Sequence, residues 1–390
     1  MEFALISDWK RWPCEEAQLG EIYAKDFARL GHRIHFLAFI SGLPEPVRRE
    51  TWHGHAVTLY RRENGTIRPL MSWLSALLKE RPLDFVQVRN DPLFAMIAAR
   101  LGRRAGKPFV YHLSVLNGPI VLAQALERSG LTRLKLWIKG TVGGYLVDRV
   151  ALTCDLLLPI SGHMENHYRA LGRTRPMLAM PMGCRDAVSS PPPPARETVE
   201  LLYLGALDWL RRLDFLLRAL ALAIKKDPRL RLTFLGSAQL DSDIVKLRDL
   251  AAELGLAHAV RFSPLIPRSE VNARIDDSDI GVSPLPPVPH FLMNSPTKLM
   301  ESLGRGRPVV GTQETPEQKA ILEESGGGLA TPFDEQAYAD AILALSLDRE
   351  RRLDSGRRGA AYMAAHRDYS ILAASAEKAY REMLTGRRSR

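Results

Sequence analysis

The chain has 390 residues, of which 46% are hydrophobic and 25% are charged, and its formal net charge is +10. This is the composition of an ordinary globular protein, and the length suits two domains of about 150–200 residues. The positive charge is spread along the chain, and aromatic residues are not interleaved with basic ones. The pattern argues against a nucleic-acid-binding protein and favours phosphorylated ligands or an anionic membrane surface.

Three other classes of protein or site are also disfavoured. Residues 1–7 carry no basic stretch ahead of a long apolar one, so they predict a first strand and not a signal peptide. No run of about 18 uncharged apolar residues predicts a transmembrane helix. Cys14, Cys154 and Cys184 lie far apart, which predicts free thiols in a reducing cytosol and no cysteine-based metal site.

Apolar runs typical of strands alternate with helical patterns in the first half of the chain. A helix is predicted over residues 15–30, where Gly31 closes it, and another over residues 92–105. The predicted strands cover residues 3–6, 32–39, 55–60, 84–88, 109–113 and 156–160. This alternation indicates an α/β fold with a parallel sheet.

Four consecutive prolines, Pro191 to Pro194, follow two serines at mid-chain. They predict a stiff extended segment, which we interpret as a domain boundary, the alternative being a surface loop inside one domain. The alternation then resumes, with strands predicted at residues 199–204, 230–235, 260–262, 280–283 and 308–311 and helices over 348–383. We therefore expect Rossmann-like domains at residues 1–190 and 195–368, and a C-terminal helix at 369–390 that packs back on the first domain.

The segment from residue 294 to residue 304 has the pattern of an anion site. Ser295 is a predicted N-cap, Pro296 suits the first helical position, and Lys298 adds a charge to the positive end of the helix dipole. Glu301 lies one turn on and can accept hydrogen bonds from ribose hydroxyls. The helix sits between two predicted strands, which places it at the carboxyl edge of a sheet, where α/β proteins bind ligands. The alternative is an ordinary capped surface helix.

The run SPTKLMESLGRGRPVV, residues 295–310, resembles the donor-site helix of retaining GT-B glycosyltransferases, the glycogen-synthase-like and mannosyltransferase-like family. Other stretches resemble family segments in the same order: residues 159–162 with 180–183, 201–208, 232–236 and 326–329. The resemblance covers almost the whole chain and is stronger in its second half. It implies two Rossmann-like domains with parallel sheets facing across a cleft.

The resemblance also implies a retaining transfer of a sugar from a nucleotide donor, with UDP or GDP as the nucleotide and no cofactor or metal. The leaving diphosphate would meet catalytic Arg211 and Lys298, and the backbone and ribose contacts would come from Gly205, Arg212, Gly236, Ser295, Pro296, Thr297 and Glu301. The acceptor would be a glycan or a polyprenyl-linked sugar in cell-surface polysaccharide or glycolipid synthesis. We expect a cytoplasmic protein on the inner face of the cell membrane.

The first domain is expected to supply the acceptor side. His112 ends a predicted strand and can hydrogen-bond the transferred sugar, so it joins the catalytic candidates. Arg89, Asn90 and Asp91 end the preceding strand and form the acceptor-side cluster; a structural role for each of these residues is the alternative. Residues 131–139 mix leucine and tryptophan with three basic residues, which indicates a helix on an anionic membrane or, equally, an ordinary core-facing helix.

The chain departs from the family pattern at three places. Met293 stands where many members have a glutamate, Ala206 stands where many have arginine, and residues 8–16 replace the first glycine-rich loop. Met293 and Ala206 leave open the alternative of a catalytically silent partner subunit. A nucleotide-sugar epimerase built on the same two-domain plan is a second alternative. The two Asp-x-Asp strings at residues 241–243 and 277–279 are not expected to bind metal, because cationic side chains already serve the diphosphate.

Overall fold

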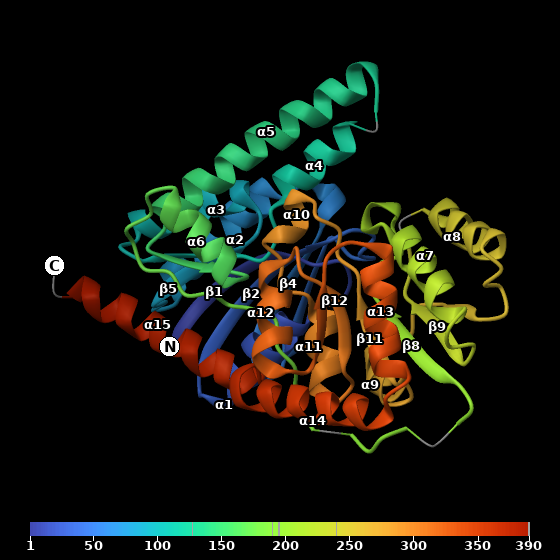
Figure 1. The fold of residues 1–390 in the computed structure, drawn as a ribbon. Coiled ribbons are helices and arrows are strands. Elements are labelled where there is room, and N and C mark those ends of the chain that lie inside the picture. The colour runs from blue at the N-terminus through green and yellow to red at the C-terminus, as the bar shows by residue number, and fades with distance from the viewer. Residues whose placement is uncertain (127, 189, 194–195, 239, 389–390) are drawn as a thin grey trace. The chain divides into compact units, whose positions relative to one another are not determined.

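The computed structural model describes residues 1–126, 128–188, 190–193, 196–238 and 240–388 (Figure 1). The chain forms two compact units, one of Met1–Pro181 with Tyr369–Arg390 and one of Met182–Asp368. The division falls before the proline-rich segment that the sequence predicts as the boundary. Part of that segment, Ser189, Pro194 and Ala195, lies outside the described residues. Pro191 belongs to the second unit, where its carbonyl accepts a hydrogen bond of 2.8 Å from Arg307.

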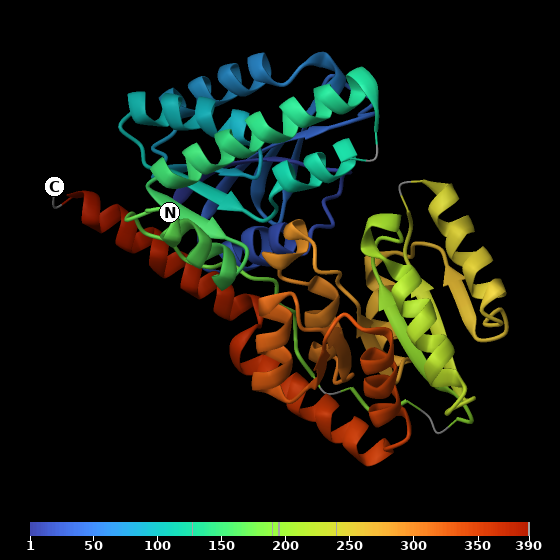
Figure 2. The ribbon, with the colours of Figure 1, turned by 45° about the horizontal axis from the view of Figure 1, so that its top comes forward.

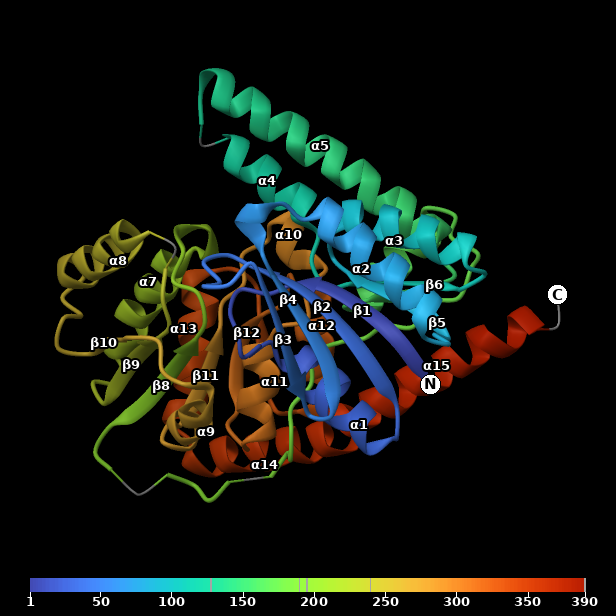
Figure 3. The same cartoon turned by 180° about the vertical axis from the view of Figure 1, so that it is seen from behind.

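The first unit is built on a seven-stranded sheet in the order β3-β4-β2-β1-β5-β6-β7, seen from behind in Figure 3. All neighbours pair in parallel except β3 with β4. The strands are β1 (Glu2–Asp8), β2 (Arg33–Ile40), β3 (Val47–Trp52), β4 (His55–Arg61), β5 (Phe85–Arg89), β6 (Phe109–Leu113) and β7 (Leu156–Pro159). β3 is an edge strand with three consecutive charged residues, Arg48 to Glu50, and the sequence prediction missed it because it has no apolar run.

Helices cover this sheet: α1 (Phe27–Arg29), α2 (Ile67–Glu80), α3 (Pro92–Arg104), α4 (Asn117–Leu126), α5 (Gly130–Thr153), α6 (Gly162–Ala170) and α15 (Tyr369–Arg388). The unit also contains the π-helix η1 (Gln18–Asp26) and the 3₁₀ turn η2 (Arg62–Asn64). The sequence predicts one α-helix over 15–30, and the structure replaces most of it by the π-helix. α15 packs on η1, and the Tyr380 ring lies tilted against Phe85 in the first unit's core, 4.7 Å between ring centroids.

The second unit has a six-stranded parallel sheet in the order β10-β9-β8-β11-β12-β13. Its strands are β8 (Val199–Leu204), β9 (Leu230–Leu235), β10 (Val260–Ser263), β11 (Ile280–Ser283), β12 (Val309–Thr312) and β13 (Gly328–Thr331). Counted within the unit this is the order 3-2-1-4-5-6 of a Rossmann sheet, so the order in which strands are added reverses between the parallel strands β8 and β11. The predicted bounds of β8, β9 and β11 are confirmed; β13 was not predicted because its glycines carry no strand signal.

The helices of the second unit are η3 (Trp209–Arg211), α7 (Leu213–Ile224), α8 (Asp241–Glu253), α9 (Arg268–Asp276), α10 (Pro289–Leu292), α11 (Thr297–Gly304), α12 (Pro316–Ser325), α13 (Glu335–Ser346) and α14 (Arg349–His366). The long helical stretch predicted over 348–383 is confirmed as α14 followed by α15. The main core of the unit joins α7 and α13 to the sheet, with Phe215 stacked on Phe333 at 4.0 Å.

Candidate functional site

The reversal point of the second sheet lies where β8 and β11 end, and the predicted anion-binding residues gather around it. Gly205 follows β8 with a φ of 131°, which only glycine adopts readily. Gly236 follows β9 so closely that a Cβ there would lie 1.9 Å from the carbonyl oxygen of Gly205. The loops after β8 and β9 are therefore in contact through their main chains, and a ligand at this edge of the sheet meets main-chain groups.

The helix after β11 starts later than the sequence predicts. α11 begins at Thr297, its N-cap is Pro296, and no side chain caps it, so the prediction that Ser295 is the N-cap is wrong. The Ser295 hydroxyl instead donates to Glu317 at 2.7 Å and accepts from the Met182 amide at 2.8 Å. Because Ser295 is engaged elsewhere, the first N–H groups of α11 have no side-chain cap and stay available to a ligand.

Glu317 is a residue of this site that sequence reasoning missed. Its carboxylate is 8% exposed and lies 3.2 Å from Arg367, in addition to its contact with Ser295. Burial raises the pKa of Glu317, and Arg367 opposes that rise. The pair fixes the segment ahead of α11, and the nearest sequence signal is only that Glu317 follows Pro316 at the start of a helix.

Lys298 and Arg211 bring two cations to the reversal point. The Nζ atom of Lys298 is buried, has no hydrogen-bond partner among the described residues, and lies 4.1 Å from the centroid of the Tyr203 ring. The guanidinium carbon of Arg211 lies 5.3 Å from the Phe291 ring centroid. Burial, and then the charge of Arg211, lower the pKa of Lys298 well below its usual value. Two such cations without a carboxylate partner form a site for an anion.

Arg212 and Glu301, also predicted to contact a donor, each have a partner of opposite charge. Arg212 has a φ of 50° and makes hydrogen bonds of 3.0 and 3.1 Å to Asp214. Glu301 is 9% exposed and lies 2.5 Å from Arg268 of α9, a residue that the sequence did not single out. Burial raises the pKa of Glu301, and Arg268 counteracts the rise.

His112 lies inside the first unit and has no exposed surface. Gln87 donates to the Tyr23 hydroxyl at 2.9 Å, and that hydroxyl lies 3.2 Å from Nδ1 of His112. Tyr380 of α15 donates to Gln87 at 2.7 Å. Burial lowers the pKa of His112, so the ring is neutral. Nδ1 and the Tyr23 hydroxyl share one hydrogen bond whose direction depends on the tautomer, and Nε2 has no partner among the described residues.

The acceptor-side cluster lies at the carboxyl ends of β1 and β5, where the strand order of the first sheet reverses. Arg89 forms an ion pair with Glu16. Asn90 has a φ of 64° and accepts from the Ser114 amide at 2.8 Å, while Asp91 caps α3 by accepting from the amides of Leu93 and Phe94. The alternative structural roles of Asn90 and Asp91 are therefore present in the fold.

Asp8 at the end of β1 completes this cluster and was not a predicted site residue. It pairs with Arg62 at 2.7 Å. Burial raises the pKa of Asp8 to about 6, against the opposing charge of Arg62 and with smaller contributions from Asp91 and Glu16. The only sequence signal was that residues 8–16 stand in place of a glycine-rich loop.

Metal binding and membrane spanning are the two other functions considered for the described residues. No group of three or more His, Cys, Asp or Glu side chains among them is arranged to hold a metal ion. No helix within the described ranges is both long and apolar enough to cross a membrane.

Comparison with known proteins agrees with this geometry. Residues 198–348 match the family model of glycosyl transferases group 1. Over 192 residues the chain is 31% identical to D-inositol 3-phosphate glycosyltransferase of Thermobispora bispora, an alignment that covers 47% of this chain and 43% of that enzyme. The chain thus spans less than half the length of this curated relative.

Two solved structures resemble the whole chain. Sucrose-phosphate synthase from Thermosynechococcus elongatus is 18% identical with a TM-score of 0.72, covering 99% of this chain and 100% of that one. HepE from Anabaena in complex with UDP-glucose is 14% identical with a TM-score of 0.69, covering 98% and 99%. The fold class predicted from the sequence is confirmed. Residues 198–348 of this chain are thus similar to the group 1 glycosyl transferases, and the chain has the GT-B fold.

Proposed function

We propose that this protein is a retaining glycosyltransferase whose second unit binds a nucleoside diphosphate sugar. The observation that supports it best is the pair Lys298 and Arg211, two cations without a carboxylate partner in the described structure, at the reversal point of a Rossmann sheet. A diphosphate supplies the missing negative charge. The relatives point the same way, because HepE was solved with UDP-glucose and the T. bispora enzyme is named a glycosyltransferase.

In the proposed reaction the bond between the anomeric carbon and the diphosphate breaks, and negative charge builds on the leaving oxygen. Arg211, Lys298 and the uncapped start of α11 stabilise that charge, each such donor being worth roughly 3–4 kcal/mol. The acceptor oxygen bonds to the anomeric carbon, and the leaving phosphate takes the proton of that acceptor hydroxyl. Glu301 keeps its ion pair with Arg268 and also accepts hydrogen bonds from the ribose hydroxyls. The backbone at Gly205 and Gly236 lies against the phosphates.

We place the acceptor at the carboxyl edge of the first sheet. Arg89, Asp91 and Asp8 offer charged hydrogen-bonding groups there, and Nε2 of His112 is directed to a hydroxyl of the transferred sugar. His112 is buried, so this last contact requires local opening of the first unit. The acceptor class we propose is a glycan or polyprenyl-linked sugar of cell-surface polysaccharide or glycolipid synthesis.

We also propose that the first unit docks on an anionic membrane through the N-terminal half of α5. α5 runs beside α4 (Figure 2), and most of its residues from 131 to 139 are exposed. Leu131 is 75% and Trp137 55% exposed, with Arg133, Lys135 and Lys139 among them. This is an exposed apolar and basic surface, unlike the core-facing helix of the alternative reading, and it suits the interface of an anionic bilayer.

Calorimetric titration with UDP, GDP, ADP and dTDP tests the donor site. We expect one nucleotide to bind, and Lys298→Ala to weaken it at least tenfold while the fold is retained. If a nucleotide binds but neither sugar transfer nor epimerisation is observed, the silent-subunit alternative is favoured. If the sugar of the donor changes configuration when no acceptor is present, the epimerase is favoured. If no nucleotide binds, the donor site as placed here is wrong.

Co-sedimentation with vesicles tests the membrane proposal. We expect salt-sensitive binding to vesicles that contain phosphatidylglycerol, and its loss in Leu134→Gln/Trp137→Gln. Equal binding by this variant would contradict the role of α5.

A further inference from the structure

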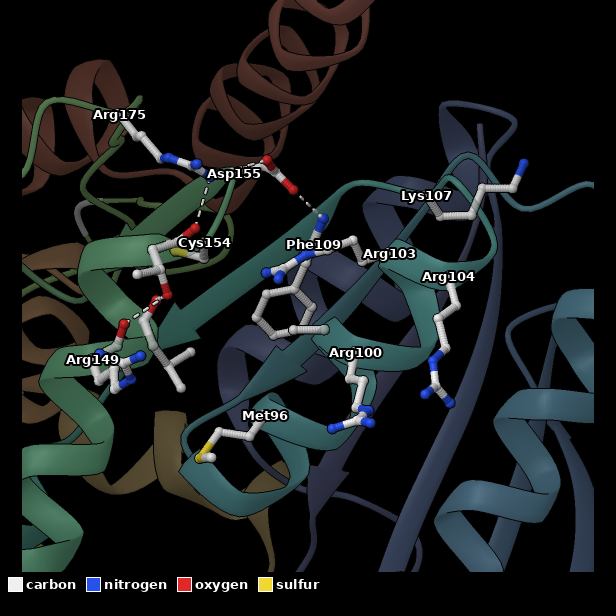
Figure 4. Close-up of a pocket in the computed structure, with 13 residues that line it drawn as sticks. Met96, Arg100, Arg103, Arg104, Lys107, Phe109, Arg149, Cys154, Asp155 and Arg175 are labelled. Carbon is white, nitrogen blue, oxygen red and sulfur yellow. Dashed lines mark hydrogen bonds and ion pairs between the residues drawn. The ribbon is translucent and has the colours of Figure 1, made fainter.

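A hollow of about 950 Å³ lies in the first unit between the C-terminal ends of α3 and α5, where β6 and β7 begin (Figure 4). This is the amino-terminal edge of the sheet, opposite the edge that carries Arg89 and Asp91. Apolar side chains, among them Met96, Phe109 and Val150, form part of its lining. The hollow therefore belongs to neither the donor site nor the acceptor-side cluster.

Six cationic side chains line this hollow. They are Arg100, Arg103 and Arg104 of α3, Arg149 of α5, and Lys107 and Arg175 outside the helices (Figure 4). Asp155 is the one carboxylate of the lining, and it already accepts from the Phe109 amide at 2.8 Å and from Arg175 at 3.3 Å. The lining thus carries six cations against one carboxylate, and that carboxylate is already paired with Arg175.

Structural roles account for only part of this charge. Cations at a helix C-terminus can serve its last carbonyl groups. At α5, however, Arg173 and Arg175 already donate to the carbonyls of Ala151, Thr153 and Cys154. At α3 the backbone amides of residues 105–107 bond the carbonyls of residues 101–103.

The side chains of five of these cations make no hydrogen bond or ion pair with the described residues: Arg100, Arg103, Arg104, Lys107 and Arg149. Exposed arginines elsewhere often do: Arg381 lies 2.7 Å from Glu377, and Arg357 lies 3.2 Å from Asp354. Five unmatched cations around one concave surface are more than a solvated helix face requires, because like charges so placed repel one another.

We propose that this hollow is a second anion site, which binds a ligand with at least two phosphate charges. Guanidinium groups match phosphate oxygens in pairs, and cations from two helices can hold a multiply charged group from both sides. The volume exceeds that of a single phosphate. The inference is independent of the proposed donor site, because none of its residues lies in the second unit.

The thiol on the lining does not take part in this binding. Cys154 is buried, and that burial raises the pKa of its thiol to about 11, so it stays protonated and unreactive at neutral pH. The ligand is held by charge and by contact with the apolar floor.

Calorimetric titration with inorganic pyrophosphate in the presence of saturating UDP tests the proposal, with a repeat in Lys298→Ala so that the donor site cannot account for binding. We expect binding that Arg100→Glu/Arg149→Glu, one change on each wall, weakens at least tenfold. Lys79→Glu/Arg81→Glu is the matched control, because these exposed residues of the same unit carry the same charge change outside the hollow.

Vesicles of phosphatidylcholine with and without 30 mol% phosphatidylglycerol distinguish the two sources of phosphate. Loss of vesicle binding in the hollow variant identifies a lipid headgroup as the source; loss of pyrophosphate binding alone identifies a soluble phosphorylated ligand. Two results would overturn the proposal: neither probe distinguishes the hollow variant from wild type, or the control variant loses as much binding as the hollow variant.

Discussion

The ammonium group of Lys298 lies 4.1 Å from the centroid of the Tyr203 ring and makes no hydrogen bond within the described part of the chain. The ring face offers an attraction of roughly 0.5–2 kcal/mol, less than a carboxylate would. Burial lowers the pKa of Lys298, and the nearby charge of Arg211 lowers it further. The buried Lys298 therefore lowers the stability of the ligand-free protein.

Lys298→Met should therefore stabilise the free protein while it removes nucleotide binding. We expect the free energy of unfolding in urea to rise by roughly 1–3 kcal/mol, because a buried unsatisfied group is replaced by an apolar one. UDP affinity should fall at least tenfold. Lys319→Met, at a partly exposed lysine 3.8 Å from Glu323, is the control and should change neither quantity appreciably. Undiminished UDP binding in Lys298→Met would remove this residue from the site.

Arg268→Ala should shift the pH dependence of nucleotide binding. Burial raises the pKa of Glu301 and Arg268 holds it down, so loss of Arg268 raises the pKa further. The carboxylate that accepts from the ribose is lost as pH falls through that pKa. UDP affinity in the variant should accordingly begin to fall at a higher pH than in wild type, measured by titration between pH 5 and 8. Arg274→Ala, on the same helix, should leave the profile unchanged; an unshifted profile in Arg268→Ala would contradict the pairing.

Gly236→Ala should destabilise the second unit strongly. Its Cβ would lie 1.9 Å from the Gly205 carbonyl oxygen, and backbone cannot move aside as a flexible side chain can. We expect a loss of at least about 3 kcal/mol, or failure to fold, in thermal unfolding. Gly143→Ala is the matched control in α5, where a Cβ meets nothing within 4 Å. That change should stabilise the protein by roughly 0.5–1 kcal/mol, and similar effects of the two changes would refute the close approach.

Asp8→Asn should alter stability as a function of pH. Because the pKa of Asp8 in the folded protein is raised to about 6, its contribution to stability is fully present below the unfolded pKa and is lost as pH rises through 6. Wild type should gain about 1–2 kcal/mol relative to the variant between pH 7 and pH 4, a figure reduced for the partial exposure of the side chain. Urea unfolding at both pH values measures this. A difference that does not vary with pH would show that the Asp8 carboxyl is not perturbed.

Most of the fold could be predicted from the sequence, because the patterns that mark strands and helices extend over only a few residues. Apolar runs such as residues 199–204 and 280–283 coincide with β8 and β11, since a parallel strand buried on both faces reads as a continuous hydrophobic segment. β3 and β13 were missed because an exposed edge strand and a glycine-rich strand carry no such run. The π-helix η1 was missed because its helical pattern does not reveal which carbonyl each amide bonds.

Only part of the candidate site could be predicted from the sequence. The pattern around Lys298 and Glu301 located the anion-binding helix, and Gly205 and Gly236 marked the loops beside it. The pattern misassigned Ser295, because a good capping residue also makes a good partner for a buried carboxylate, and Glu317 is distant in sequence. The partners Arg268 and Tyr203 had no signal, and Asp8 had only its place at a missing glycine-rich loop, since each acts through a contact between segments far apart in the chain.

The sequence by itself thus determined the elements, their order and the helix that can receive an anion, because periodicity, glycine and the first residues of a helix act over a few positions. Only the tertiary structure decided which charges remain unpaired. Whether Lys298, Arg100 or Arg149 faces a carboxylate or none depends on the folding of distant segments onto one another, and it is the unpaired charges that identify where a ligand binds.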